Sequence, residues 1–373
     1  MINYYINDIE SLKKQNLYRK LSDSRSLSSN VIRKNNKNLI SFACNDYLGL
    51  SHNSALKKSA ILAIKKYGVG ARASRYITGN NIIYGKLEKA LAKFYKNDDA
   101  LIFSSGYSCA IGVVKALVGE GDLIIADKFI HACLIDGAQL SQAKFTRFDH
   151  NNLEHCKQIL QKNRKQYKKC LIVTETIFSM DGDVGKIAEL LNFAEEFDAI
   201  LLSDDAHGLG QNILPHSRHL QMGTLSKAFT SLGGFVVGDK ILIEYLRQFA
   251  RSAIYSTALP PAILASSLQA LKIISKKNLA QKSIENAQYF CQLMNLPKPE
   301  SSIVIIKIGD SKKTVDIAKK IAENGFLIGA IRPPTVPKNQ ARLRLTFSAS
   351  HRKNDIKKLA KKMKLICNFQ AKN

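Results

Sequence analysis

Two stretches of the sequence place a carboxylate, an imidazole and an amine where buried strands are expected to end. The apolar run at 199–205 leads into Asp204 and, shortly after it, His207. Lys227 follows in the stretch TLSKAF, after a second strand-like segment, and its neighbours are small or apolar. Acids at the end of a buried strand are costly unless a cation meets them, so we expect the three side chains to share one crevice. A helix cap or a structural ion pair is the alternative interpretation of Asp204.

A lysine in such a crevice has a specific chemical use. Burial disfavours the ammonium form and lowers the pKa of the amine, and the neutral amine can form a Schiff base with a carbonyl compound. A carboxylate that faces a pyridine nitrogen keeps that nitrogen protonated. These are the two groups that proteins commonly supply to pyridoxal phosphate, so Lys227 and Asp204 point to that cofactor.

The phosphate of such a cofactor needs its own binding place. The residues SSGY (104–107) follow the apolar segment 100–103 and begin a predicted helix. The first N–H groups of a helix attract anions, and Gly106 lets the backbone approach a ligand closely. Thr224 can add a hydroxyl group to this binding place for the phosphate.

Short apolar segments alternate with helical ones over residues 98–240. Strands that are nearly continuous in apolar residues are typical of a parallel or mixed sheet covered on both faces. We therefore predict an α/β fold, with a large domain in which a mostly parallel sheet lies between helices and a smaller C-terminal α+β domain. The strands predicted for the large domain are 100–103, 123–127, 170–175, 199–205, 221–226 and 233–238.

The remaining patterns complete the expected organisation. Residues 54–67 are predicted to form a helix that ends at Gly68, and the start of the chain is predicted to be an amphipathic helix. The other predicted helices are 186–197, 241–276, 312–324 and a basic one from 353, and the other strands are 301–308, 326–331 and 341–347. We expect an N-terminal helical segment (1–45), a large cofactor-binding domain (46–270) and a small C-terminal domain (271–373).

The bulk composition excludes several classes of protein. A length of 373 residues with 45% hydrophobic content can bury a large core. No run of apolar residues is long enough to span a membrane, and the first residues lack the apolar core of a signal peptide, so we expect neither a membrane span nor a signal peptide. The seven scattered cysteines fit a reduced, cytoplasmic location, and neither they nor the eight histidines have metal-ligand spacing. The net charge of +26 reflects lysine-rich helices or attraction of an acidic ligand, but no nucleic-acid-binding motif is present.

Taken together, the motifs resemble those of the α-oxoamine synthases, a family of fold-type I pyridoxal phosphate enzymes. The resemblance covers nearly the whole chain, and its strength lies in the order and spacing of the motifs. The matching segments are NDYLGLS (45–51), SSGY (104–107), IHACLIDG (130–137), ETIFSMDGD (175–183), DDAHG (204–208), TLSKAF (224–229), RPPTVP (332–337) and RLRLTFSASH (342–351).

The resemblance implies a role for each matched residue. Lys227 would hold the cofactor and act as the base, and Asp204 would face the pyridine nitrogen. His131 would stack on the ring and contact the substrate. The other cofactor contacts implied are Gly106, Tyr107 and Thr224 for the phosphate and ring, Ser179 and His207 for the phenolic oxygen, and Ser256 and Thr257 for the phosphate of a neighbouring subunit. Shared sites of this kind imply a homodimer.

Substrate contacts are implied as well. A bidentate arginine is the physical expectation for a substrate carboxylate, and Arg344 is our choice, with Arg342 as the alternative. Arg19 and Thr335 resemble contacts to an acyl substrate.

The RPPTVP and RLRLT segments resemble the biotin-pathway branch of the family. That branch condenses L-alanine with a pimeloyl thioester, carried on coenzyme A or on an acyl carrier protein, and releases CO₂. Branches that use glycine, such as glycine C-acetyltransferase and 5-aminolevulinate synthase, are the nearest alternatives. A basic nucleic-acid-binding protein on an inactive enzyme scaffold is a more distant one.

Two residues depart from the family pattern. Tyr84 stands where many relatives have histidine, and Thr230 stands where glycine or another small residue usually follows the lysine. Neither change removes a group that the chemistry requires.

Overall fold

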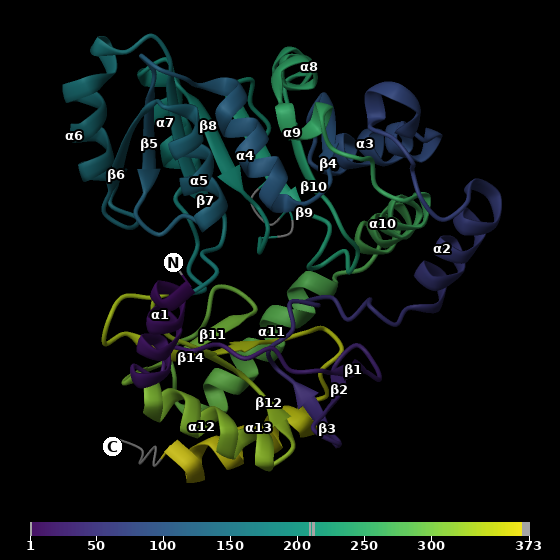
Figure 1. Cartoon of the computed structure of the whole chain (residues 1–373), viewed down its shortest axis with the longest axis vertical. Helices are drawn as coiled ribbons and strands as arrows, with labels where there is room; N and C mark the ends of the chain where they lie inside the picture. The colour runs from purple at the N-terminus through teal and green to yellow at the C-terminus, as the bar shows by residue number, and fades with distance from the viewer. Residues whose placement is uncertain (1, 209, 211–212, 368–373) are drawn as a thin grey trace. The chain divides into compact units, whose positions relative to one another are not determined.

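The structure is a computed structural model that describes residues 2–208, 210 and 213–367. The described chain forms two compact units, drawn in Figure 1. The first unit comprises the residues up to Gly49, Met180–Gly182 and the residues from Leu279 onward, and the second comprises Leu50–Ser179 and Asp183–Asn278. The division expected from the sequence, at 1–45, 46–270 and 271–373, stays a prediction.

The second unit is built on a mixed sheet, which has seven strands among the described residues, in the order β4-β10-β9-β8-β7-β5-β6. Strand β10 is antiparallel to its neighbours β4 and β9, and the pairs from β9 to β6 are parallel. The mostly parallel sheet of the predicted α/β fold is thus confirmed. The strands are β4 (Asp99–Phe103), β5 (Leu123–Asp127), β6 (Lys144–Phe148), β7 (Cys170–Glu175), β8 (Ile200–Asp204), β9 (His219–Thr224) and β10 (Gly234–Gly238).

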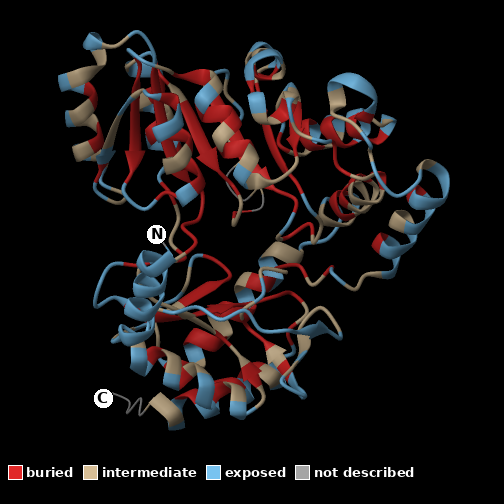
Figure 2. Ribbon diagram, viewed as in Figure 1, coloured by how far each residue is buried: buried red, intermediate tan, exposed pale blue. Residues whose placement is uncertain are grey.

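Both faces of this sheet are covered, and the side chains explain why. Successive residues of a strand point to opposite faces. On β5, Ile124 and Ala126 therefore pack in a core with helices α4, α5, α8 and α9, whereas Leu123 and Ile125 pack in another with α6 and α7. Figure 2 shows most strands of this sheet as buried, and the edge strand β6 is the exception. This two-sided burial is the physical reason for the nearly continuous apolar strands in the sequence.

Three helices predicted in the second unit, at 54–67, from SSGY onward and at 186–197, match α2, α4 and α7, whereas α5 and α6 were not predicted. Helix α2 begins after Asn53, whose side chain accepts the N–H of Ala55, and ends at Gly68, where φ is 84°. The prediction of one helical stretch over 241–276 was wrong, because the chain leaves the helix between α9 and α10. The helices are α2 (Ser54–Tyr67), α3 (Ile82–Phe94), α4 (Gly106–Leu117), α5 (Ala132–Ser141), α6 (Leu153–Asn163), α7 (Ile187–Glu196), α8 (Lys240–Phe249), α9 (Arg251–Ile254) and α10 (Pro261–Ile274), with short helical turns η1 (Arg75–Gly79) and η2 (Arg164–Gln166).

The first unit holds two small sheets, of four and three strands among the described residues. The predicted strand 326–331 was wrong as a single element, since β12 pairs with β3 and β13 pairs with β14. The strands are β1 (Arg25–Ser26), β2 (Val31–Lys34), β3 (Lys37–Ser41), β11 (Ile303–Gly309), β12 (Phe326–Leu327), β13 (Gly329–Ile331) and β14 (Ala341–Thr346).

One apolar core holds this unit together. Phe290 of helix α11, Leu343 of β14 and Leu359 of helix α13 are all fully buried in it. The helices are α1 (Ile2–Lys14), α11 (Leu279–Met294), α12 (Ser311–Glu323) and α13 (Lys353–Cys367). Across the described residues, no helix of either unit combines the length and the apolar character that crossing a bilayer requires.

Truncation of Leu343 tests the importance of this core. Leu343→Ala should lower the free energy of unfolding by about 2–5 kcal/mol, because it leaves a cavity where the leucine is fully buried. Leu365 of the same unit is 65% exposed, so Leu365→Ala is the matched control and should change it by less than about 0.5 kcal/mol. Urea unfolding followed by circular dichroism measures both, and equal effects would contradict the assigned core.

Candidate active site

The carboxyl ends of the parallel strands bring most of the predicted site residues to one edge of the sheet. Strands β8 and β9 are neighbours, so Asp204 at the end of β8 lies beside Met222 of β9, and Lys227 follows shortly after β9. Ligands of open α/β sheets bind beyond this edge.

Lys227 and His207 are in direct contact. The Nζ atom of Lys227 lies 2.9 Å from Nε2 of His207. The lysine is half-buried rather than buried, in a turn where the N–H of Thr230 donates to the Lys227 carbonyl oxygen at 2.9 Å. The amine and the imidazole, which were predicted to lie close together, are therefore neighbours.

Two buried carboxylates lie side by side behind this pair. Glu175 at the end of β7 is the register partner of Asp204, and both are almost inaccessible to solvent. Desolvation raises the pKa of Asp204, and the neighbouring Lys227 cation opposes that rise. Desolvation also raises the pKa of Glu175, with the Asp204 charge adding to the rise. The lysine ammonium thus counterbalances a concentration of negative charge.

Glu175 was not among the predicted site residues, although it connects two of them. The backbone N–H groups of His131 and Ser179 stabilise its carboxylate form and so lower its pKa, against the larger rise caused by desolvation. An acid at the end of a buried strand is the signal that singled out Asp204, and the stretch CLIVTE carries the same signal. Glu175 therefore belongs to the candidate site as a residue that orients its loops.

His131 and Tyr107 border the site from the starts of α5 and α4. His131 caps α5, and its Nδ1 accepts the N–H of Cys133 at 3.3 Å, which leaves the ring proton on Nε2 when the imidazole is neutral. The rings of Tyr107 and His131 are 6.5 Å apart, edge to face, and the Tyr107 hydroxyl donates to Asp136.

The start of helix α4 packs closely against the end of β9 and the start of β10. Ser105 caps the helix by accepting the N–H of Ser108, and Gly106 lies against Thr224. A Cβ atom on Gly234 would lie 2.4 Å from the carbonyl oxygen of Ser105 and 2.7 Å from Cα of Gly106, so the backbones meet closely there. The first N–H groups of a helix have no partner within it and favour an anion.

Ser256 and Thr257 are placed apart from this group. They lie in the break between α9 and α10, where Thr257 forms a bridge with Ser74. The N–H of Leu259, two residues on, donates to the hydroxyl of the fully buried Tyr84 at 2.6 Å. Tyr84, the departure noted in the sequence, thus anchors the segment that carries Ser256 and Thr257.

The predicted substrate residues belong to the first unit. Arg344 is buried on β14 and donates to the side chains of Asn45, at 3.2 Å, and Thr346, at 3.1 Å. Arg342 is paired with the carboxylate of Asp181 at 2.5 Å. Because Arg342 already binds a carboxylate of its own unit, Arg344 is the better candidate for a substrate carboxylate.

Arg19 and Thr335 are brought together although they are far apart in the sequence. The guanidinium of Arg19 donates to the Thr335 hydroxyl at 3.1 Å, and both residues are exposed. The two residues predicted to contact an acyl group are therefore neighbours.

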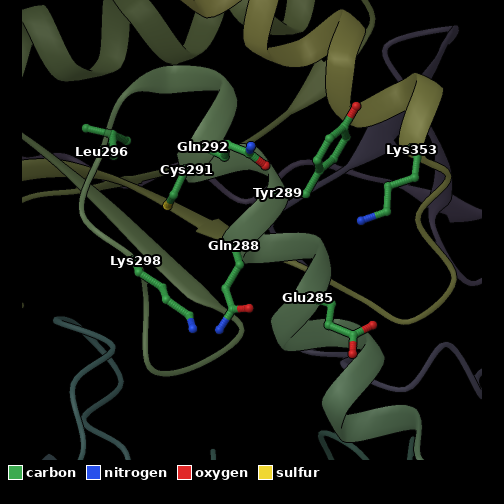
Figure 3. Close-up of a pocket in the computed structure, with 8 residues that line it drawn as sticks. All are labelled: Glu285, Gln288, Tyr289, Cys291, Gln292, Leu296, Lys298 and Lys353. Carbon is green, nitrogen blue, oxygen red and sulfur yellow. The ribbon is translucent and has the colours of Figure 1, made fainter.

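Figure 3 shows a separate hollow of about 430 Å³ in the first unit. Lys298 and Lys353 line it, and Nζ of Lys353 lies 4.2 Å from the centre of the Tyr289 ring. None of the residues that line it is a predicted site residue.

The chain is similar to known proteins over nearly its whole length. Residues 37–363 match the family model described as aminotransferase class I and II. The 8-amino-7-oxononanoate synthase of Methylocella silvestris is 42% identical, over 90% of this chain and 99% of that protein. The enzyme of the same name from Maricaulis maris is 39% identical, over 96% and 95%.

Solved structures agree with these matches. The 8-amino-7-oxononanoate synthase from Francisella tularensis superposes with a TM-score of 0.74 at 29% identity, covering 89% of this chain and 98% of that one. A serine palmitoyltransferase from Sphingomonas wittichii has a TM-score of 0.88 at 24% identity, covering 98% of each chain, and shows the fold alone.

Replacement of Thr230 tests the turn that follows Lys227. Thr230 has φ of 53°, which a β-branched residue rarely adopts, and its buried hydroxyl has no hydrogen-bond partner among the described residues. Thr230→Gly should raise the free energy of unfolding by about 1–2 kcal/mol, because it relieves the left-handed strain and removes the hydroxyl.

Thr230→Ala is the matched control, because it removes the hydroxyl but keeps the Cβ atom. Urea unfolding should rank the stabilities glycine above alanine above threonine. A glycine variant less stable than the threonine protein would contradict the strain assigned to this turn.

Proposed function

The chain belongs to the aminotransferase class I and II family, and we propose that it condenses L-alanine with a pimeloyl thioester to give 8-amino-7-oxononanoate in biotin biosynthesis. It is a pyridoxal phosphate-dependent enzyme of that family. The observation that carries the proposal is the contact between Lys227 and His207 beside the buried carboxylate of Asp204. Relatives about 40% identical, named for this reaction, support the choice of substrates.

The residues at the edge of the sheet fit pyridoxal phosphate. Its phosphate suits the start of α4, where Gly106, Tyr107 and Thr224 meet. Its pyridine nitrogen suits Asp204, a buried acid whose negative charge would keep that nitrogen protonated. When bound, the cofactor supplies an electron-withdrawing ring that stabilises negative charge on the substrate carbon beside the amine.

The chain's own groups supply binding and proton transfer. Lys227 would hold the cofactor through Nζ and, once alanine has replaced it, remove the proton from Cα of alanine. His207 and Ser179 would bind the oxygen side of the ring. His131 would lie over its face, where the N–H bond to Glu175 fixes its backbone.

The reaction balances without a further reactant. A carbon–carbon bond forms between Cα of alanine and the acyl carbon, and the carbon–sulfur bond breaks with release of the thiol. The alanine carboxylate then leaves as CO₂, and a proton is returned to the same carbon. Arg344 would bind that carboxylate until it leaves, and Arg19 with Thr335 would contact the acyl chain.

We also propose a homodimer with shared sites. Ser256 and Thr257 follow an exposed aromatic residue, since Tyr255 is 71% exposed, and Ile77 of the nearby η1 turn is 76% exposed. Large exposed apolar groups favour burial against a second copy. In this arrangement Ser256 and Thr257 reach the cofactor phosphate of the partner.

Replacement of Lys227 tests the proposed activity. Lys227→Ala should lower the rate of product formation from alanine and pimeloyl-CoA about 1,000-fold or more, since both the cofactor attachment and the base are lost. Lys240→Ala, at an exposed position of α8, is the matched control and should keep the activity. Turnover of glycine with acetyl- or succinyl-CoA, and none of alanine, would overturn the substrate assignment while leaving the role of Lys227 intact.

Mixing two inactive variants tests the shared site. Lys227→Ala and the double variant Ser256→Ala/Thr257→Ala should each have low activity. A hybrid dimer contains one site in which Lys227, Ser256 and Thr257 are all native, so random subunit exchange should restore about a quarter of the native rate. Absence of recovery, with dimers seen by sedimentation, would place Ser256 and Thr257 in the site of their own subunit.

A further inference from the structure

His150 lies between two carboxylates near the candidate site, in a group that none of the predicted roles uses. Its Nδ1 is 3.0 Å from Oδ1 of Asp127, and its Nε2 is 2.7 Å from Oδ2 of Asp183. Asp127 is fully buried, and the His150 ring packs against Phe129 and, edge to face, against Phe178. We call Asp127, His150, Asn151 and Asp183 the His150 cluster.

The geometry favours a charged imidazole. A neutral imidazole has one N–H group, so one of the two carboxylates would then face a lone pair. With both nitrogens protonated, His150 donates to both acids. Desolvation lowers the pKa of His150, but the bonds to Asp127 and Asp183 outweigh it and raise the pKa to about 10. Asp149, the residue before His150, is itself paired with Lys128 and His155.

The cluster joins the ends of three neighbouring strands. Asp127 ends β5, His150 follows β6, and Asp183 follows β7, and Figure 1 shows these strands side by side. Asn151 strengthens the link, because its backbone N–H donates to Asp127 and its side chain donates to Asp183.

Two loops of the candidate site are attached to the His150 cluster, one at Asp183 and the other at Asp127. The segment between Ile177 and Val184 is closed at its base, where the N–H of Phe178 donates to the carbonyl oxygen of Asp183 at 3.0 Å, and Ser179 is the next residue. On the other side, Asp127 accepts the N–H of Phe129 at 2.8 Å and begins the turn that leads to His131.

We propose that His150 is a positioning residue: as an imidazolium it neutralises Asp127 and Asp183 and so fixes the two loops that carry His131 and Ser179. The inference rests on the proposed function, in which those two residues contact the cofactor. Glu175 ties the same loops together at His131 and Ser179, and His150 ties them at Asp127 and Asp183. Without the cation, the two acids repel each other and the loops separate.

A charge-rescue experiment tests the role. His150→Gln keeps a polar side chain but leaves two carboxylates without a cation, and should weaken pyridoxal phosphate binding about tenfold. Adding Asp183→Asn removes one of the charges, so the double variant should bind the cofactor more tightly than His150→Gln alone. His155→Gln, at a more exposed histidine, is the matched control and should bind as the native protein does.

Two further measurements do not depend on the cofactor. Hydrogen exchange of the amides in 177–184 should speed up in His150→Gln and slow again in the double variant. In the native protein, NMR of the His150 ring should show both nitrogens protonated from pH 6 to 9.

The outcomes separate the two proposals. A native protein that does not bind pyridoxal phosphate refutes the proposed function, while exchange and NMR still decide whether His150 fixes the loops. A neutral His150 ring at pH 7 overturns the positioning role. So does a His150→Gln variant that binds the cofactor as tightly as the native protein, even if it unfolds more readily.

Discussion

The pair of buried acids at the ends of β7 and β8 is the constraint on which the site depends. Glu175 and Asp204 are register neighbours in a sheet covered on both faces, where uncompensated charge is costly. Lys227 and backbone N–H groups stabilise these acids. The N–H groups of His131 and Ser179 stabilise Glu175, and the N–H of Ala206 donates to Asp204. Stabilising the acids therefore also sets the positions of the loops that surround them.

Other carboxylates along this edge of the sheet are also stabilised by several hydrogen-bond donors. Asp205 accepts the hydroxyl groups of Tyr95, at 2.5 Å, and Thr176, at 2.7 Å, together with the N–H of Gly210 at 2.6 Å. Farther along this edge, Asp127 at the end of β5 pairs with His150, which follows β6. Carboxylates at strand ends, each with several donors, thus connect the sheet to the loops. A loop bound in this way presents its side chains in one arrangement, which a site that must orient a ligand requires.

The departures from the family pattern have local physical explanations. Tyr84 is buried, and its hydroxyl holds the segment before α10, while its ring lies 4.0 Å below the guanidinium of Arg75. Thr230 occupies a left-handed turn where glycine is free of strain, which explains why a small residue suits that position. Neither residue alters the lysine, the imidazole or the acid, and the chemistry proposed for the site remains available.

The sequence by itself determined six of the seven strands described in the large sheet, helix α2 with its end at Gly68, and the proximity of Lys227 and His207, because apolar runs and strand-end polar residues are local signals. It did not reveal β6, an edge strand whose Lys144 and Arg147 interrupt the apolar pattern, or the break between α9 and α10. Only the tertiary structure decided that Glu175 holds two loops, that Arg342 binds Asp181 and that His150 lies between two acids. Those partners are distant in the sequence, and they meet only through strand order and register, which no local pattern specifies.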